Sequence, residues 1–147
     1  MKLVKTLVSV VAVASAMVGA HAADTNTVFL RQQQPENVPA VNVYIGGEYL
    51  TSLLPNTYRQ TPMCAGEVSL SVENVAPNVP QGHIQKSELG KKVMNAAGAT
   101  TYYLIVAEGG KPVLQQLPEE QGKQLQAQLK EYTYMLSRVD SVRKCPQ

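Results

Sequence analysis

The chain has 147 residues, with 13 basic and 11 acidic side chains and a formal net charge of +2 at neutral pH. This length suits one compact domain with an ordinary hydrophobic core. Lys2 and Lys5 account for the excess positive charge, so the chain that follows them is formally neutral. A neutral chain lacks the basic surface of a nucleic-acid-binding protein. We therefore expect no nucleic-acid partner.

The first 22 residues have the pattern of a secretory signal peptide. Lys2 and Lys5 precede an apolar run over Leu7–Val18, and the segment ends in Ala20-His21-Ala22, the small-x-small pattern of a signal peptidase site. The apolar run of about a dozen residues is short for a membrane span, which needs about 20. We therefore expect cleavage after Ala22 rather than a retained membrane anchor.

The expected location is the periplasm, with outer-membrane association and secretion as alternatives. A lipoprotein would need cysteine as its first mature residue, whereas position 23 is alanine, so no lipid anchor is expected. The chain has two cysteines, Cys64 and Cys145, and an oxidising compartment would allow them to pair. No Cys-x-x-Cys redox motif is present, so a structural bond is expected rather than a redox site. A bond between Cys64 and Cys145 would close a long loop and stabilise the fold by roughly 4 to 5 kcal/mol at most. We predict a Cys64–Cys145 disulfide.

After the leader, β-forming runs alternate with turn residues. Gly46-Gly47 and Gly109-Gly110 supply the positive φ angles of two-residue hairpin turns. Pro62 indicates an edge strand, because proline cannot donate to a central ladder. The run 100–107 lacks polar alternation, which predicts a central strand buried on both faces. About seven strands are expected, over 27–31, 41–45, 48–54, 57–63, 67–73, 100–107 and 111–117, with 74–98 as an irregular surface segment. Residues 23–117 are thus predicted to form an antiparallel β-sandwich.

From Pro118 the apolar period becomes helical. Glu119 and Glu120 suit the positive end of a helix, which is predicted to extend from Pro118 to about Ser141. Residues 118–147 would then form an amphipathic helix and tail of the same domain. Its apolar stripe consists of Leu125, Leu129, Tyr132, Leu136 and Val139. We favour packing of this stripe on the sheet, with partner binding or assembly of a homo-oligomer as the alternative.

No residue pattern indicates catalysis. His83 is the one histidine after the leader and has no cysteine or carboxylate at metal-ligand spacing, so it is interpreted as a loop residue. The chain has no Gly-x-Ser-x-Gly nucleophile motif, and both glycine pairs belong to hairpins rather than to phosphate-binding loops. We expect no catalytic residues, no metal, no cofactor and no enzymatic activity.

Tyrosines are concentrated in the predicted strands of a chain that has no tryptophan. We interpret them as core and cross-strand residues, with a sugar-stacking surface as the alternative. These tyrosines are Tyr44, Tyr49, Tyr58, Tyr102 and Tyr103.

The hairpin sequence Val41–Leu50, the Cys64-Ala65-Gly66 turn and the strand Glu67–Val72 together carry a resemblance. They resemble small envelope β-sandwich domains of the PEGA-like and DUF2846-like kind. The order of hairpin, cysteine turn, tyrosine-rich strand, glutamine-rich helix and late cysteine is similar to the N-terminal domain of some OmpA-family proteins. These are peptidoglycan-associated partners of trimeric autotransporter adhesins.

This resemblance implies a non-enzymatic adaptor or assembly-support protein that binds another envelope protein or an autotransporter-type adhesin. The sequence ends at Gln147, so we expect no OmpA-like C-terminal domain and carry over no peptidoglycan-binding residues. The strand edge at 57–63 and the stripe at 125–139 are the expected contact surfaces. An exported glycan-binding module that uses the strand tyrosines is the alternative function.

Overall fold

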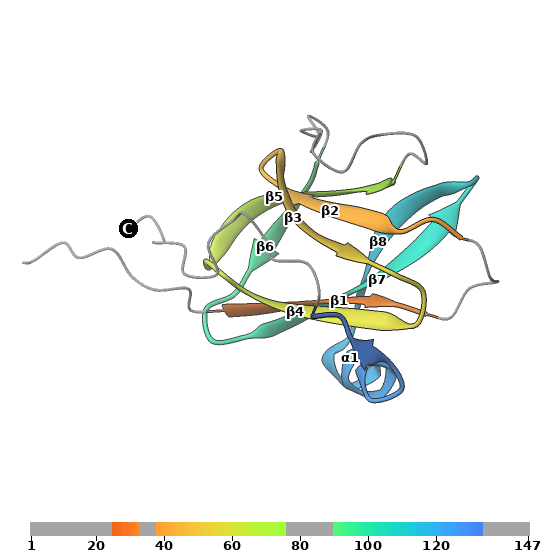
Figure 1. Cartoon of the computed structure of the whole chain (residues 1–147). Coiled ribbons are helices and arrows are strands. Elements are labelled where there is room, and N and C mark those ends of the chain that lie inside the picture. The colour runs from red at the N-terminus through yellow and green to blue at the C-terminus, as the bar shows by residue number, and fades with distance from the viewer. Residues whose placement is uncertain (1–24, 33–37, 76–89, 134–147) are drawn as a thin grey trace, which may run out of the picture.

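The computed structural model describes residues 25–32, 38–75 and 90–133 (Figure 1). These residues form nine strands and one helix: β1 (Thr25–Arg31), β2 (Val41–Ile45), β3 (Glu48–Leu53), β4 (Thr57–Met63), β5 (Gly66–Asn74), β6 (Lys91–Asn95), β7 (Thr100–Glu108), β8 (Lys111–Leu117), α1 (Glu119–Gln126) and β9 (Lys130–Glu131). The predicted signal peptide lies outside the described residues and stays a prediction.

The strands form two sheets. The five-stranded sheet has the order β8-β7-β1-β4-β9 and the four-stranded sheet the order β3-β2-β5-β6. Figure 1 shows α1 on the face of the five-stranded sheet that points away from the other sheet. The prediction of a β-sandwich with one C-terminal helix is confirmed. The prediction that it is wholly antiparallel is wrong, because β1 pairs with β7, and β4 with β9, in parallel.

Both predicted hairpins are confirmed. The φ angles are 56° and 80° at Gly46 and Gly47, and 58° and 78° at Gly109 and Gly110. Two successive positive φ angles define the type I′ turn, whose twist matches that of the flanking strands. The strands on either side therefore pair directly from the turn, with Ile45 opposite Glu48 and Glu108 opposite Lys111.

The core has two parts because the five-stranded sheet is covered on both faces. Between the sheets, Phe29 and Tyr103 pack with apolar residues of the four-stranded sheet. On the other face, Val28, Leu30 and Tyr102 form a second cluster, which we call the outer cluster. Neighbouring strand residues thus point to opposite layers. This confirms the prediction of a central strand, since β7 lies between β8 and β1, and burial on both faces is confirmed over residues 101–105 but not at the exposed Ala107.

One strand lies where the sequence predicted an irregular surface segment. β6 pairs antiparallel with β5 and directs Val93 into the core. Lys92 on this strand forms an ion pair of 3.2 Å with Glu67 on β5. The local sequence Lys-Lys-Val-Met-Asn has one clearly inward apolar residue, so its alternation is too weak to indicate a strand. The hydrogen-bonded pairing with β5 makes this segment a strand although its own sequence pattern does not indicate one.

The helix is much shorter than predicted, because it ends at Gln126 rather than near Ser141. The N–H groups of Gln128 and Leu129 donate to the carbonyls of Leu125 and Gln126 at 3.0 and 3.1 Å, which tightens the chain into a turn. Lys130–Glu131 then pairs with the start of β4. Strand pairing therefore replaces the last turns of the predicted helix.

β4 was predicted to be an edge strand, and this is wrong at its first two residues. Thr57 and Tyr58 pair with β9, so β4 is the second strand of the sheet there. Pro62 lies farther along β4, opposite Asn26 of β1 and beyond the reach of β9. A residue without an N–H group is tolerated at that position because no ladder partner needs it.

We predict that Tyr103→Phe stabilises the protein. Tyr103 is 1% exposed, its ring stacks on Phe29 at 6.1 Å, and its hydroxyl has no hydrogen-bond partner among the described residues. Removal of an unsatisfied buried hydroxyl should raise the free energy of unfolding by about 1 kcal/mol, measured by urea titration. A loss of stability of that size would contradict the prediction.

The same substitution should change the alkaline limit of stability. Burial raises the pKa of Tyr103 above its ordinary value of 10.0. The unfolded chain therefore loses this proton first as the pH rises, so stability falls above about pH 10 until the folded-state pKa is passed. Tyr103→Phe should show a smaller fall in urea midpoint above pH 10 than the wild type.

Candidate functional site

The predicted apolar stripe is only partly helical. Leu125 lies on α1 and Leu129 just beyond it, and both are half-buried against the outer cluster of Val28, Leu30 and Tyr102. The favoured interpretation, packing on the sheet, is confirmed for these two leucines. They are therefore largely used within the chain rather than offered to a partner.

The other stripe residues do not continue a helix. Tyr132 follows β9, where its backbone N–H donates to the carbonyl of Tyr58 at 2.8 Å and its own carbonyl accepts from Arg59 Nη1 at 2.8 Å. The prediction of a continuous helical stripe is therefore wrong at Tyr132. Leu136 and Val139 lie outside the described residues.

The predicted disulfide is described at one end only. Cys64 follows β4 and is not a free thiol. Cys145 lies outside the described residues, so the Cys64–Cys145 pairing stays a prediction. His83, interpreted as a loop residue, is also outside them.

Four of the five strand tyrosines are buried: Tyr44, Tyr49, Tyr102 and Tyr103 are 1 to 6% exposed, and Tyr58 is half-buried. The interpretation as core and cross-strand residues is confirmed for these four.

Tyr44 and Tyr49 belong to a buried polar chain on the outward side of β2 and β3. Their rings pack edge to face at 6.2 Å. The Tyr49 hydroxyl is hydrogen-bonded to Ser52 at 2.7 Å, Ser52 donates to Asn42 at 2.6 Å, and Asn42 donates to the Tyr44 hydroxyl at 3.2 Å. Burial raises the pKa of Tyr49, against a smaller opposing effect of its bond to Ser52. Each tyrosine hydroxyl therefore has a partner within this polar chain, and the buried rings are not exposed for stacking on a sugar.

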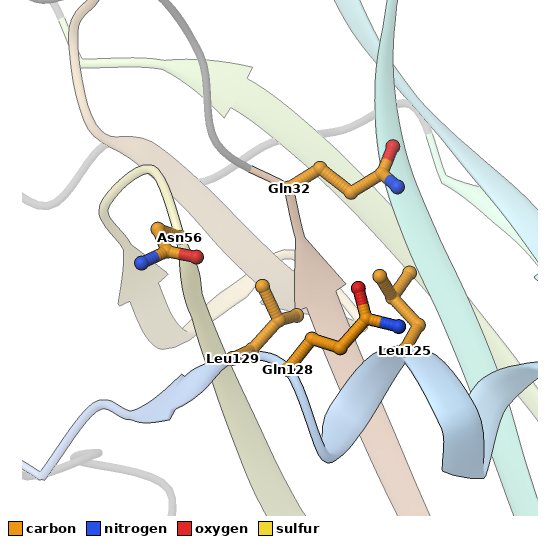
Figure 2. Close-up of a pocket in the computed structure, with 5 residues that line it drawn as sticks. All are labelled: Gln32, Asn56, Leu125, Gln128 and Leu129. Carbon is orange, nitrogen blue, oxygen red and sulfur yellow. The ribbon is translucent and has the colours of Figure 1, made fainter.

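A pocket of about 370 Å³ lies where α1 ends (Figure 2). Three carboxamide side chains and two leucines line it: Gln32, Asn56, Gln128, Leu125 and Leu129. Figure 2 shows the leucines and Gln128 rising from the end of α1 toward the side of the pocket formed by Gln32 and Asn56. The described residues of this lining include no charged side chain. We call this the amide pocket.

Backbone hydrogen bonds hold the three segments of the amide pocket together. Asn56 has a φ of 61° in the turn between β3 and β4. Its N–H donates to the carbonyl of Gln32 at 3.3 Å, and its carbonyl accepts from the N–H of Lys130 at 3.2 Å. The sequence analysis missed this pocket. Its one local signal is the Pro55-Asn56 turn, because asparagine tolerates positive φ.

The outer edge of β8 is a second candidate site. Glu108 and Lys111 close the two-residue hairpin as a hydrogen-bonded pair, and such pairs alternate with non-bonded ones along an antiparallel ladder. Pro112, Leu114 and Gln116 therefore direct their backbone polar groups away from β7. β8 ends the five-stranded sheet, and no described strand pairs with this edge.

A groove of about 430 Å³ lies beside the β8 edge, between β8 and β5. Its apolar surface includes core-forming residues of both sheets, and charged residues of opposite sign lie on its lining. The lining residues are Leu70, Ser71, Val72, Lys91, Glu108, Pro112, Val113 and Leu114. An edge with unused backbone groups thus adjoins a surface that can accept apolar side chains.

These features define a small β-sandwich with a helix packed on one sheet. No family model, curated protein or solved structure matches the chain. In the part of the chain that the structure describes, no helix is long and apolar enough to cross a membrane. Within the same residues, no group of three or more histidine, cysteine or acidic side chains is placed to hold a metal ion.

Proposed function

We propose that the protein is a non-enzymatic adaptor, exported to the periplasm, that binds an extended segment of another envelope protein along β8. The observation that carries this proposal is the open edge of β8 beside an apolar groove. The sequence resemblance to PEGA-like envelope domains and to adhesin-associated OmpA-family domains supports the cellular setting. An autotransporter-type adhesin is the partner class that this resemblance favours.

The β8 edge offers the backbone chemistry that strand addition requires. Leu114 and Gln116 each present an N–H and a carbonyl outward, and Pro112 presents a carbonyl only. A strand that pairs here would extend the five-stranded sheet, and its hydrogen bonds would provide affinity without regard to sequence. Pro112 limits the length of that pairing near the hairpin turn.

The groove supplies selectivity. Alternate side chains of an added strand point to the same face, so every second one would lie against Leu70, Val72 and Leu114. Lys91 and Glu108 border this apolar surface. The partner segment is therefore extended and carries alternating apolar residues flanked by charges of either sign.

Two other outer strands, β9 and β6, are poorer candidates. β9 has two residues and covers the start of β4. β6 begins with the exposed lysines Lys91 and Lys92, and charged edge residues disfavour pairing with another chain. Because Leu125 and Leu129 pack on the sheet, the helix is also a weaker partner surface than the sequence indicated.

We predict that Gln116→Pro abolishes partner binding while Gln116→Ala preserves it. Both substitutions remove an exposed side chain, but only proline removes the outward N–H group. Neither removes a hydrogen bond to β7, because Gln116 and Tyr103 form a non-bonded pair. The measurement is pull-down from a detergent extract of envelopes with each tagged variant, with captured proteins compared by mass spectrometry.

A specific protein captured by wild type and Gln116→Ala, and lost with Gln116→Pro, supports the proposal. Equal capture by all three contradicts strand addition at β8, and so does failure of the wild type to capture a specific protein. Urea midpoints for both variants establish that the sandwich is intact. If Gln116→Pro unfolds, Gln116 N-methylation by semisynthesis removes the same donor without the proline ring.

A further inference from the structure

We infer that the amide pocket, lined by Gln32, Asn56, Leu125, Gln128 and Leu129, binds an uncharged saccharide. This function is separate from the proposed binding of a protein segment along β8. The two sites share no residue, since the amide pocket lies at the end of α1 and the groove lies between β5 and β8.

The hydrogen-bonding groups of the amide pocket are neutral and two-sided. Each of the three carboxamides offers two donors and one acceptor oxygen, and none forms a side-chain hydrogen bond with another described residue. A phosphate or carboxylate would find no cation among the described lining residues. Adjacent hydroxyl groups of a sugar both donate and accept hydrogen bonds, so they can bond to the donors and acceptors of the three carboxamides around the pocket. A saccharide is the common neutral ligand with that pattern.

The two leucines give the amide pocket an apolar side. Leu125 and Leu129 are half-buried and anchored in the outer cluster, which leaves part of each side chain facing the pocket. The C–H surface of a sugar ring can pack on such a side while its hydroxyls reach the carboxamides. A volume of about 370 Å³ falls in the range of small-ligand sites.

The amide pocket is also preorganised. Asn56 is the one non-glycine residue with positive φ in the described part of the chain. Its backbone is bonded on one side to Gln32 and on the other to Lys130, so the turn is fixed from both directions. A turn that is fixed in this way loses less conformational entropy on binding.

The test is titration of the mature protein with maltotriose, cellotriose and N,N′-diacetylchitobiose, followed by backbone amide NMR. We expect at least one saccharide to shift the resonances of residues 32, 56 and 125–129. Asn56→Gly keeps the positive φ and removes the carboxamide, and Gln128→Ala removes a second one. Each should weaken that binding by about fivefold to tenfold, the effect of one lost hydrogen bond.

Gln116→Ala is the matched control, because it removes an exposed carboxamide outside the amide pocket and should leave saccharide binding unchanged. The inference is overturned if none of the three saccharides shifts the pocket resonances. It is also overturned if the Asn56→Gly and Gln128→Ala double variant binds like the wild type, or if triglycine shifts the pocket and no saccharide does. Gln116→Pro should bind saccharide with the affinity of the wild type. If the β8 proposal fails, the saccharide titration can therefore still support or overturn binding in the amide pocket.

Discussion

Replacement of Gly122 with alanine is expected to lower the free energy of unfolding by about 2 to 3 kcal/mol, although alanine is the better helix former. Gly122 is the buried residue of α1. A Cβ atom there would lie 2.5 Å from both Cβ and Cδ1 of Tyr102, and closer still to its Cγ. Tyr102 is 4% exposed and cannot simply turn away. Either α1 lifts from the sheet or Tyr102 leaves its rotamer.

The measurement is the urea midpoint at unchanged m-value. Gln124→Ala is the control, because Gln124 is an exposed residue of the same helix and its substitution should change stability by less than about 0.5 kcal/mol. If both variants unfold at the same urea concentration, the close approach of α1 to β7 is not a stabilising requirement. Gly122 would then have no packing role.

Sequence reasoning succeeded where structure is decided locally. The two glycine pairs define their hairpins because two successive positive φ angles are strongly restricted to glycine-like residues. It failed where a distant partner decides the outcome. The apolar period continues through Leu129 and Tyr132, yet the helix ends because the backbone N–H groups of Lys130 and Tyr132 bond to the carbonyls of Asn56 and Tyr58. No feature of residues 127–132 alone reveals that pairing.

The candidate sites were missed for the same physical reason. Gln32, Asn56 and Gln128 are ordinary surface carboxamides in sequence, and only the meeting of β1, the β3–β4 turn and the end of α1 brings them together. The β8 edge was missed only in part. Its strand was predicted, but the outward direction of Leu114 and Gln116 follows only from the hairpin register and from the place of β8 at the end of the sheet.

Arg31→Met is expected to lower the free energy of unfolding by about 3 kcal/mol. Arg31 is 4% exposed at the end of β1. Its Nη1 donates to the carbonyl of Leu53 and its Nη2 to the carbonyl of Pro39, both at 2.8 Å, so one side chain joins β1 to the end of β3 and to the segment before β2. Burial lowers the pKa of Arg31. Methionine fills similar volume but supplies neither hydrogen bond, and the loss of two charge-assisted bonds outweighs the relief from burying a charge.

Arg31→Lys separates charge from geometry. A lysine keeps the positive charge, but its single ammonium group cannot reproduce the planar fork that reaches two carbonyls on different segments. We expect an intermediate loss of stability in urea, whereas Lys111→Met, which removes an exposed charge at the start of β8, should change it by less than about 0.5 kcal/mol. If Arg31→Met matches the wild type in stability, burial of the guanidinium costs as much free energy as its two hydrogen bonds supply.

Arg31→Met should also weaken saccharide binding in the amide pocket, because Gln32 follows Arg31 and its carbonyl accepts a hydrogen bond from the N–H of Asn56. Lys111→Met should leave saccharide binding unchanged.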